Sequence, residues 1–341
     1  MGPSPEQTIK KVLLIGEIDH AHDAWKSLEE DGVVETVHVK ATNRADFLQE
    51  AGTGAFEGIY AVYRNLPSVS ITGRIDAELL EALPRSLKFI CHVGAGYDQI
   101  DVHACSARSI RVSNVPTAPD DATADVNMFL IIGALRGFNC GMAGLRRGEW
   151  KGGAPLGHDP QGKILGILGM GGIGRTLKRR TDAFGMKVIY HNRTRLPESL
   201  EAGAAYVGFD ELLARADVIS LNLPLNKHTH HIISTAEFAK MKDGVVIVNT
   251  ARGAVIDEDA LVKALDSGKV RSVGLDVFEN EPEVHPGLMA NDHVMLVPHM
   301  GTHTYETQTA MECWCIDNLR MACTIGELKS LVPEQAGLSF T

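Results

Sequence analysis

The sequence lacks any apolar run long enough to cross a membrane. The longest such run covers residues 128–135, whereas a transmembrane helix needs about 20 apolar residues. The first residues, MGPSPEQTIKK, also lack the apolar segment of a secretory signal, and Glu6 stands where a myristoylation signal has Ser or Thr. These absences predict a cytoplasmic protein with no membrane partner.

Positive charge and metal-binding patterns are also scarce. Lys and Arg total 33 against 43 Asp and Glu, a formal net charge of −10. Nucleic acids require clustered positive charge, so none is expected as a partner. The six cysteines have no metal-like spacing and are expected to be reduced thiols. His228, His230 and His231 have no cysteine or carboxylate at a suitable local spacing, so no metal site is predicted.

The chain does contain many short apolar runs that alternate with helical patterns. Buried strands are predicted at residues 12–16, 87–92 and 163–168, and further candidates include KVIYH, DVISLNL, VVIVNT and SVGLDV. This alternation is typical of α/β proteins with a parallel sheet covered by helices on both faces. The 341 residues exceed the roughly 250–300 that one core accommodates, so two domains are expected.

The order of the elements predicts two doubly wound parallel-sheet domains with a cleft between them. The alternation stops at the two prolines of VPTAP and restarts at residues 163–168. We expect a flavodoxin-like substrate domain, formed discontinuously by residues 1–115 and 302–341. Residues 116–301 are expected to form a Rossmann dinucleotide-binding domain. Within them, residues 120–147 contain no proline and are predicted to form one long apolar helix that packs between domains or subunits.

A glycine-rich motif follows the strand predicted at residues 163–168. Gly169, Gly171 and Gly174 give the pattern G-x-G-x-x-G between a strand and a helix. The first glycine permits a tight turn, the second lets the backbone approach a pyrophosphate, and the third allows close packing of helix and strand. The helix N-terminus adds N–H donors and partial positive charge. The predicted phosphate contacts are Gly169, Met170, Gly171, Gly172, Ile173 and Gly174.

The end of the next predicted strand lacks the carboxylate that an NAD site usually places there. KVIYH continues instead into Asn192, Arg193, Thr194 and Arg195. A guanidinium group binds a 2′-phosphate through charge-assisted hydrogen bonds. The sequence therefore predicts NADP(H) as the preferred cofactor, with NAD(H) as the alternative.

Three polar residues follow three successive strand candidates. Arg252 follows VVIVNT, Glu281 follows SVGLDV and His299 follows HVMLVP. Ligands bind at the carboxyl ends of parallel strands, so these side chains are expected in one site. Arg252 is suited to hold a carboxylate and polarise a carbonyl, and His299 to donate a proton to the developing alkoxide. Glu281 would hydrogen-bond the imidazole and favour its charged form.

The motifs HVGAGYDQID, GILGMGGIG, NTARGAVID, GLDVFENEP and VPHMG occur here in that order. With them, the sequence resembles the D-isomer-specific 2-hydroxyacid dehydrogenase family, and most of all its NADP-dependent glyoxylate/hydroxypyruvate reductases. The resemblance implies that Arg252, Glu281 and His299 are catalytic and that the backbone of Ala95 and Gly96 binds the substrate carboxylate. It also implies cofactor contacts from Thr123, Leu223, Pro224, Thr229, Thr250, Ala251, Asp276 and Gly301.

The expected activity is NADPH-dependent reduction of a small 2-oxo acid to the D-2-hydroxy acid, with His299 as the proton donor. One alternative is a D-mandelate-type dehydrogenase acting on bulkier 2-oxo acids. Another is a non-enzymatic, dinucleotide-sensing scaffold of the corepressor type. Arg64 is a further candidate for substrate contact, while the roles of Trp150 and Thr302 stay open. The long helix and the resemblance together predict a homodimer.

Overall fold

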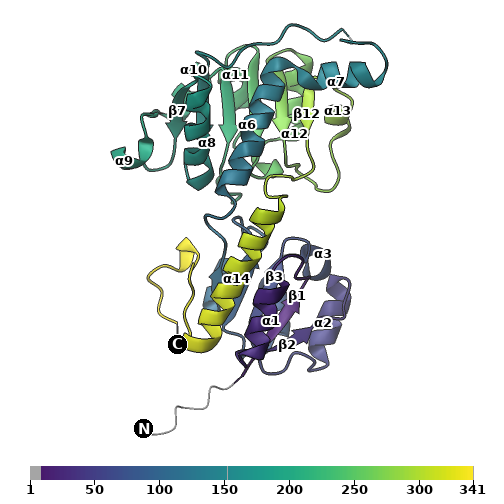
Figure 1. The fold of residues 1–341 in the computed structure, drawn as a ribbon, viewed down its shortest axis with the longest axis vertical. Helices are drawn as coiled ribbons and strands as arrows, with labels where there is room; N and C mark the ends of the chain where they lie inside the picture. Colours follow the sequence, from purple (N-terminus) through teal and green to yellow (C-terminus); the bar gives the residue numbers. More distant parts are fainter. Residues whose placement is uncertain (1–8, 152, 341) are drawn as a thin grey trace. The chain divides into compact units, whose positions relative to one another are not determined.

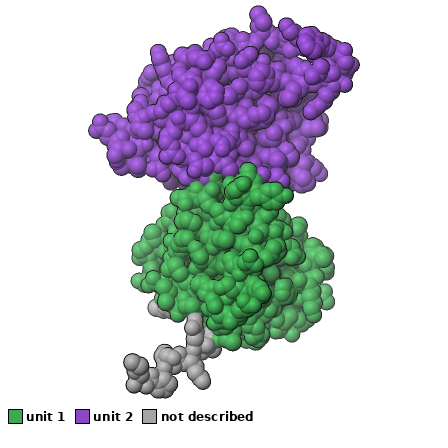
Figure 2. Space-filling view, in the orientation of Figure 1, with its two compact units in different colours: residues 1–119, 304–341 green, residues 120–303 purple. Residues whose placement is uncertain are grey.

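A computed structural model describes residues 9–151 and 153–340 of the chain. The chain forms two compact units, coloured separately in Figure 2. Unit 1 comprises Met1–Pro119 and Thr304–Thr341, and unit 2 comprises Asp120–His303. Part of the segment expected to lack a secretory or lipid signal, residues 1–8, lies outside the described residues.

Unit 1 contains a five-stranded parallel sheet in the order β2-β1-β3-β4-β5, the order of flavodoxin-like folds. Its strands are β1 (Lys10–Ile15), β2 (Val34–His38), β3 (Ile59–Asn65), β4 (Phe89–Val93) and β5 (Arg111–Ser113). All five residues of β4 are buried, as expected for a parallel strand that is covered on both faces. The helices are α1 (His22–Glu30), α2 (Arg44–Gly52), α3 (Val69–Thr72), α4 (Ala77–Ala82), α5 (Val102–Ala107) and α14 (Tyr305–Ile325), with a 3-10 turn at Pro333–Gln335.

The last helix of the chain, α14, completes unit 1 by packing on β3 and β4 (Figure 1). It begins where the Thr304 hydroxyl accepts a hydrogen bond from the backbone of Thr307, and it ends at Gly326, whose φ is 71°. Its buried Glu312 accepts hydrogen bonds from the backbone N–H groups of residues 19–21, at 2.7–3.0 Å. The carboxylate therefore joins α14 to the turn that precedes α1.

Unit 2 contains a seven-stranded parallel sheet in the order β12-β11-β10-β9-β6-β7-β8. With β6 taken as strand 1 and the sheet read from β8 to β12, the order is 3-2-1-4-5-6-7. This is the Rossmann order 3-2-1-4-5-6 with β12 added at the edge. The strands are β6 (Ile164–Leu168), β7 (Lys187–His191), β8 (Ala205–Tyr206), β9 (Val218–Leu221), β10 (Val245–Asn249), β11 (Val270–Leu275) and β12 (Val294–Leu296). The predicted α/β fold with two doubly wound parallel sheets is confirmed.

Helices cover both faces of the unit 2 sheet and bury a separate apolar cluster on each. The first cluster contains residues of α6 (Asp120–Arg136) and α8 (Gly172–Ala183). The second contains residues of α10 (Phe209–Arg215), α11 (Thr235–Lys240) and α12 (Glu258–Asp266). The shorter elements are α7 (Phe138–Arg146), α9 (Glu198–Glu201), α13 (Pro286–Met289) and a 3-10 turn at Gly253–Val255.

The prediction of one long helix over residues 120–147 is wrong. The segment forms α6 and α7, which meet at Gly137 and differ in direction by 76°. Gly137 has φ 63° and ψ 35°, a left-handed conformation that ends a helix and that glycine adopts without steric cost. The absence of proline is therefore not enough to predict a continuous helix.

Among the described residues, no single helix is long and apolar enough to span a membrane. The bent pair α6–α7 passes that test by length and composition only.

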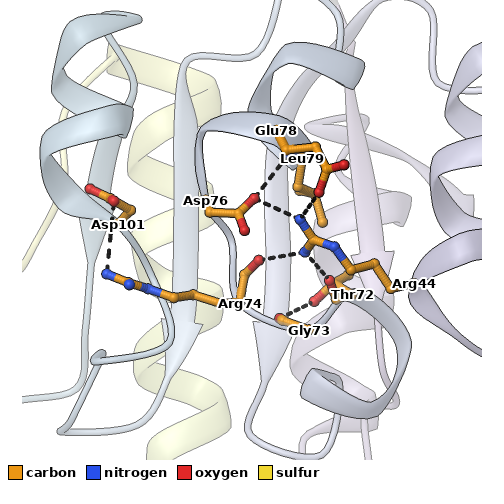
Figure 3. Close-up of polar contacts among 8 residues, drawn as sticks. All are labelled: Arg44, Thr72, Gly73, Arg74, Asp76, Glu78, Leu79 and Asp101. Carbon is orange, nitrogen blue, oxygen red and sulfur yellow. Dashed lines mark hydrogen bonds and ion pairs between the residues drawn. The ribbon is translucent and has the colours of Figure 1, made fainter.

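In unit 1, one arginine joins three helices (Figure 3). Arg44, the first residue of α2, donates hydrogen bonds to the carbonyl oxygens of Thr72 and Arg74, both at 2.7 Å. It also donates to the carboxylates of Asp76 and Glu78, again at 2.7 Å. Asp76 caps α4, and Thr72 is the last residue of α3. The bonds to these carboxylates raise the pKa of Arg44, so the guanidinium stays charged while it contacts all three helices.

Candidate active site

The glycine loop connects β6 to the N-terminus of α8 in unit 2. Gly169 has φ 97°, and a β-carbon there would lie 2.6 Å from the carbonyl oxygen of Asn222. A β-carbon on Gly174 would lie 2.6 Å from the carbonyl oxygen of Gly169, which explains the close packing of helix and strand. Among described residues, nothing lies within 4 Å of a β-carbon placed on Gly171. The loop therefore leaves backbone open at the helix N-terminus, as a pyrophosphate requires.

Asp120, the first residue of α6, lies against this loop and was missed in the sequence analysis. A β-carbon on Gly172 would collide with its carboxylate. Burial raises the pKa of Asp120 to about 6, and the neighbouring Asp121 contributes to the increase, while Arg175 opposes it. The only sequence signal was an acidic residue at a helix start, which ordinarily indicates a cap.

The segment after β7 places its two arginines in different surroundings. Arg195 is paired with the buried carboxylate of Glu201, with Nε 2.7 Å from Oε1 and Nη2 3.1 Å from Oε2. The hydrogen bonds from Arg195 and from the Tyr190 hydroxyl hold the pKa of Glu201 well below its usual range. Arg193 is exposed and forms no hydrogen bond or ion pair within the described residues. Asn192 accepts a hydrogen bond from the Met170 backbone N–H at 2.7 Å, so this segment is attached to the glycine loop.

Arg252, Glu281 and His299 follow the adjacent strands β10, β11 and β12. The three strands are parallel, so these residues all lie beyond the carboxyl ends of neighbouring strands. Arg252 Nη1 donates a hydrogen bond to the carbonyl oxygen of Ala251 at 2.8 Å. The parallel register thus places a guanidinium, a carboxylate and an imidazole at one edge of the sheet.

Glu281 and His299 form a hydrogen-bonded pair. Glu281 Oε2 lies 2.9 Å from His299 Nδ1, while Glu281 Oε1 accepts a hydrogen bond from the Phe278 N–H at 2.9 Å. Burial raises the pKa of Glu281, but the bond to His299, the charge of His299, the Phe278 N–H and Arg252 together lower it below its usual value. Because Nδ1 is held by a charged carboxylate, Nε2 is the ring nitrogen left for proton transfer.

Asp276, buried at the end of β11, fixes the turn that carries His299. Its carboxylate accepts hydrogen bonds from the backbone N–H groups of Met300 and Gly301, and its carbonyl oxygen accepts one from His299 N at 2.8 Å. A β-carbon on Gly301 would lie 2.9 Å from Asp276 Oδ2 and 3.4 Å from Thr123 Cγ2. Burial raises the pKa of Asp276 to about 6, against the opposing effect of these hydrogen bonds. Thr123, Asp276 and Gly301 thus lie together.

The other expected cofactor contacts follow β9 and β10. They are Leu223, Pro224 and Thr229 after β9, and Thr250 and Ala251 after β10. Leu223 lies against the glycine loop, because a β-carbon on Gly169 would be 3.1 Å from its Cδ2. The Thr229 hydroxyl donates a hydrogen bond to the Pro224 carbonyl at 2.6 Å, which closes its loop.

In unit 1, Ala95 and Gly96 lie in the loop that follows β4. The Ala95 carbonyl accepts a hydrogen bond from Asn114 Nδ2 at 2.8 Å, and the Gly96 carbonyl lies 3.0 Å from His92 Nε2. Within the described part of the chain, the amide N–H groups of Ala95 and Gly96 donate no hydrogen bond. The loop therefore holds its carbonyl groups inward and leaves two adjacent donors for an anion.

Arg64 lies in β3 and is fully buried, and the negative charge of Asp98 acts on its guanidinium. Its Nε donates to Ser68 Oγ and its Nη1 to Gln99 Oε1, both at 3.3 Å, while Nη2 has no partner among described residues. Burial lowers the pKa of Arg64 to about 10. Outside these clusters, Trp150 is 75% exposed and Thr302 is half-buried.

Comparison with known proteins decides the family. The family profile described as "D-isomer specific 2-hydroxyacid dehydrogenase, NAD binding domain" matches residues 128–301. The 4-methyl-2-oxopentanoate reductase A of Aspergillus oryzae is 56% identical over 95% of this chain and 98% of its own length. The chain belongs to the D-isomer-specific 2-hydroxyacid dehydrogenase family. Glyoxylate reductase 1 of Saccharomyces cerevisiae is also similar, with 47% identity over 95% of this dehydrogenase and 94% of its own length.

Solved structures support the same assignment. A glyoxylate reductase from Paecilomyes thermophila has a TM-score of 0.93 and 56% identity over 96% of this chain and 99% of that chain. The holo form of Rhodotorula graminis D-mandelate dehydrogenase has a TM-score of 0.90 and 31% identity over 95% and 98%. An NADPH-dependent glyoxylate/hydroxypyruvate reductase of Sinorhizobium meliloti, in complex with NADP and malonate, has a TM-score of 0.83 and 29% identity over 95% and 97%.

The family resemblance predicted from the motifs is therefore confirmed. This dehydrogenase is an NAD(P)-dependent oxidoreductase of a family that acts on small 2-oxo or 2-hydroxy acids. Its cofactor is a nicotinamide dinucleotide. The glycine loop and the open backbone at Gly171 fit the phosphates of such a cofactor.

A buried amide in α6 of the dehydrogenase was also missed in the sequence analysis. Asn127 Nδ2 donates hydrogen bonds to the hydroxyls of Ser220 and Thr250, both at 2.9 Å. These two residues belong to β9 and to the loop after β10, so one side chain ties α6 to both. An isolated asparagine in an apolar helix gives no sequence signal for this role, because its partners lie about 100 residues away.

Two further glutamates hold the turn that carries Glu281. The backbone N–H of Glu279 donates to Glu258 Oε1 at 2.8 Å, and the backbone N–H of Glu258 donates to Glu279 Oε2 at 3.4 Å. Burial raises the pKa of Glu258, and the charges of Glu279 and Glu281 contribute to the increase. Glu258, in the first turn of α12, and Glu279 are thus joined by two hydrogen bonds, and Glu281 lies two residues after Glu279.

Proposed function

We propose that this dehydrogenase reduces a small 2-oxo acid of the glyoxylate or hydroxypyruvate type to the D-2-hydroxy acid with NADPH as the reductant. The observation that carries the proposal is the 2.9 Å pair of Glu281 and His299, with Arg252 on the adjacent strand end. In this arrangement His299 can donate a proton to the substrate, and the neighbouring Arg252 can bind the substrate carboxylate. The description of the family as D-isomer specific supports the D configuration.

Each group then has a defined task. NADPH, when bound, supplies a hydride to the carbonyl carbon of the oxo acid. Arg252 binds the substrate carboxylate and polarises the carbonyl, and His299 Nε2 donates a proton to the oxygen that becomes the hydroxyl. Glu281 stabilises the imidazolium before transfer. The amides of Ala95 and Gly96, which are free of partners within the described residues, favour a substrate-binding role for unit 1, and the glycine loop favours the cofactor role for unit 2.

The NADPH preference rests on Arg193. Its guanidinium is exposed and unpaired within the described residues, whereas Arg195 already binds Glu201. We assign Arg193 the main contact with the 2′-phosphate, with Asn192, Thr194 and Arg195 around it. The similar S. meliloti reductase, whose structure contains NADP, supports the assignment.

A substrate panel tests the proposal. The kcat/KM values for glyoxylate, hydroxypyruvate, 4-methyl-2-oxopentanoate and phenylglyoxylate would be measured with NADPH and with NADH. We expect the two small acids with NADPH to give the highest values. Equal or higher values with NADH would contradict the cofactor assignment, and undetectable turnover across the panel would favour a dinucleotide-sensing scaffold.

A preference for bulkier 2-oxo acids is the second candidate, because two similar proteins are a 4-methyl-2-oxopentanoate reductase and a D-mandelate dehydrogenase. Arg64 bears on this choice. Its buried Nη2 group has no hydrogen-bond partner among the described residues and favours a substrate group that accepts hydrogen bonds over an alkyl or phenyl group. Hydroxypyruvate, which carries a hydroxyl, therefore fits better than phenylglyoxylate.

We also propose that the dehydrogenase is a homodimer through α6, α7 and the segment after them. Large apolar side chains are exposed there, as in Phe138 (41%), Met142 (39%), Leu145 (58%) and Trp150 (75%). An apolar surface of this kind on one segment is typical of a protein interface. The break at Gly137 turns α7 away from the direction of α6 and presents this surface separately from the core.

A further inference from the structure

Two consecutive histidines after β9 meet a glutamate from the turn after β11. His231 Nε2 lies 2.6 Å from Glu279 Oε1, and the rings of His230 and His231 stack with centroids 4.0 Å apart. One ligand atom from each of the three residues lies within 4.8 Å of the other two. We propose that His230, His231 and Glu279 form a binding site for a divalent cation of the zinc type.

The sequence predicted no metal site because no carboxylate lies at a suitable spacing from these histidines along the chain. The fold brings one to them, that of Glu279. Glu279 is 48 residues away from His231 along the chain. His231 has φ 50°, in the left-handed region, and its backbone N–H donates to Ala254 O at 2.9 Å. This anchored conformation places the two imidazoles side by side, at an interplanar angle of 27°, next to the same carboxylate.

The donor set selects the kind of cation. Two imidazole nitrogens and one carboxylate are ligands that zinc prefers, whereas calcium and magnesium prefer oxygen ligands alone. Zinc would sit about 2.0–2.2 Å from each ligand atom and take the place of the hydrogen bond between His231 and Glu279. His230 is exposed and the other two are half-buried, so a cation can enter and complete its shell with water.

The surrounding charge favours a cation. The carboxylates of Glu258 and Glu279 each accept a hydrogen bond from the backbone N–H of the other residue, and Glu281 follows two residues after Glu279. Two of these carboxylates, from Glu279 and Glu281, therefore belong to the turn after β11, and the third, from Glu258, belongs to the first residue of α12. Neutralising one of them by a bound cation reduces the repulsion among them.

Occupancy has a consequence for catalysis, and this part rests on the proposed function. Glu279 and Glu281 belong to one turn, in which the Phe278 N–H also holds the Glu281 carboxylate. His231 Nε2 and Glu279 Oε1 are 2.6 Å apart, so a cation bound between them would push the Glu279 carboxylate away and displace that turn. We therefore expect zinc to lower kcat with little change in the KM for NADPH.

The test measures zinc binding to chelator-treated full-length protein by competition with a chromophoric chelator. We expect one saturable site that is weakened by His230→Ala and by Glu279→Gln. Removing a residue that only orients a metal ligand typically lowers the affinity for the metal by about 10–100-fold. Removing a ligand itself should therefore lower the affinity for zinc by at least that factor. His228→Ala, in the same loop and outside the cluster, is the matched control and should bind as the wild type does.

Substitution of His230 removes an exposed side chain, so this variant keeps the fold even if Glu279→Gln does not; thermal unfolding of both checks this point. Cobalt(II) provides a second probe, since its visible absorption reports nitrogen and oxygen ligation in the wild type and should be lost in His230→Ala. Absence of a saturable site, or equal affinity in the wild type and both variants, would overturn the proposal. Zinc inhibition of reduction, lost in His230→Ala, is scored separately, so a chain without reductase activity leaves the binding result intact.

Discussion

The proposed proton transfer depends on the hydrogen bond between Glu281 and His299. The Glu281 side chain is 34% exposed, and its pKa lies below the usual value because the bond to His299 and the nearby positive charge outweigh the effect of burial. The carboxylate therefore stays charged down to pH values below its ordinary pKa, so an anion lies beside the imidazole. The same hydrogen bond fixes the orientation of the ring.

Glu281→Gln should keep the hydrogen bond and lose the charge. The imidazolium is then less stable, so the alkaline limb of the pH profile for reduction should move to lower pH. Turnover should lose part of the about 100- to 10,000-fold that general acid catalysis contributes. The pH dependence of kcat/KM checks this, and an unchanged profile would contradict the role of Glu281.

Arg193→Ala should raise the KM for NADPH by about 10-fold or more, because hydrogen bonds to charged groups are worth about 1.5–3 kcal/mol. The KM for NADH should change little, since NADH lacks the 2′-phosphate. Initial-rate kinetics with both cofactors measure the difference. Arg195→Ala is the comparison: it should affect NADPH less, and a larger effect there would reverse the assignment of the two arginines.

Asp120 should make cofactor binding depend on pH. Its pKa of about 6 means that it is mostly protonated at pH 5 and ionised at pH 7, beside the loop proposed to bind phosphates. Ionisation repels a pyrophosphate, so the KM for NADPH should rise between pH 5 and 7, and Asp120→Asn should flatten this rise. Asp121→Asn, whose side chain is 76% exposed in the wild type, should retain the dependence.

At the scale of elements, the strands could be predicted and some connections could not. The buried strands form continuous apolar runs, so the sequence located them. The proposed catalytic residues come three to six residues after three of these strands, and their roles stay predictions. The break at Gly137 depends on one backbone conformation that other glycines in helices do not adopt. The contacts of Asn127, and of His231 with Glu279, join residues far apart in the chain, so no local pattern could indicate them.

Arg44 illustrates how few contacts position several short helices. Arg44→Ala should lower the free energy of unfolding by about 1–3 kcal/mol, because carbonyl groups and carboxylates lose a charged donor. Arg74→Ala is the control, since its contact with Asp101 is longer, at 3.8 Å, and its side chain is 58% exposed. Urea unfolding of the two variants measures the difference, and equal stabilities would show that the Arg44 connections contribute nothing.

For the whole molecule, the apolar surface of α7 is the feature that predicts assembly. Leu145→Glu should place a charge in the proposed dimer interface and shift the protein from twice the chain mass toward the single-chain mass. Light scattering over a range of concentrations measures this shift. A wild-type protein with the mass of one chain at all concentrations would rule out the dimer, and an unaffected variant would place the interface elsewhere.

The position of α14 also affects how the protein is made. Synthesis delivers unit 2 as one continuous stretch, whereas unit 1 begins first and receives its covering helix last. Until α14 leaves the ribosome, the apolar side chains of β3 and β4 on that face stay uncovered, and the turn before α1 lacks the carboxylate of Glu312. Nascent chains would then pass through a stage in which unit 2 is folded while unit 1 still exposes an apolar surface prone to aggregation. Chaperone binding to nascent chains should therefore be strongest after unit 2 has emerged and before α14 has.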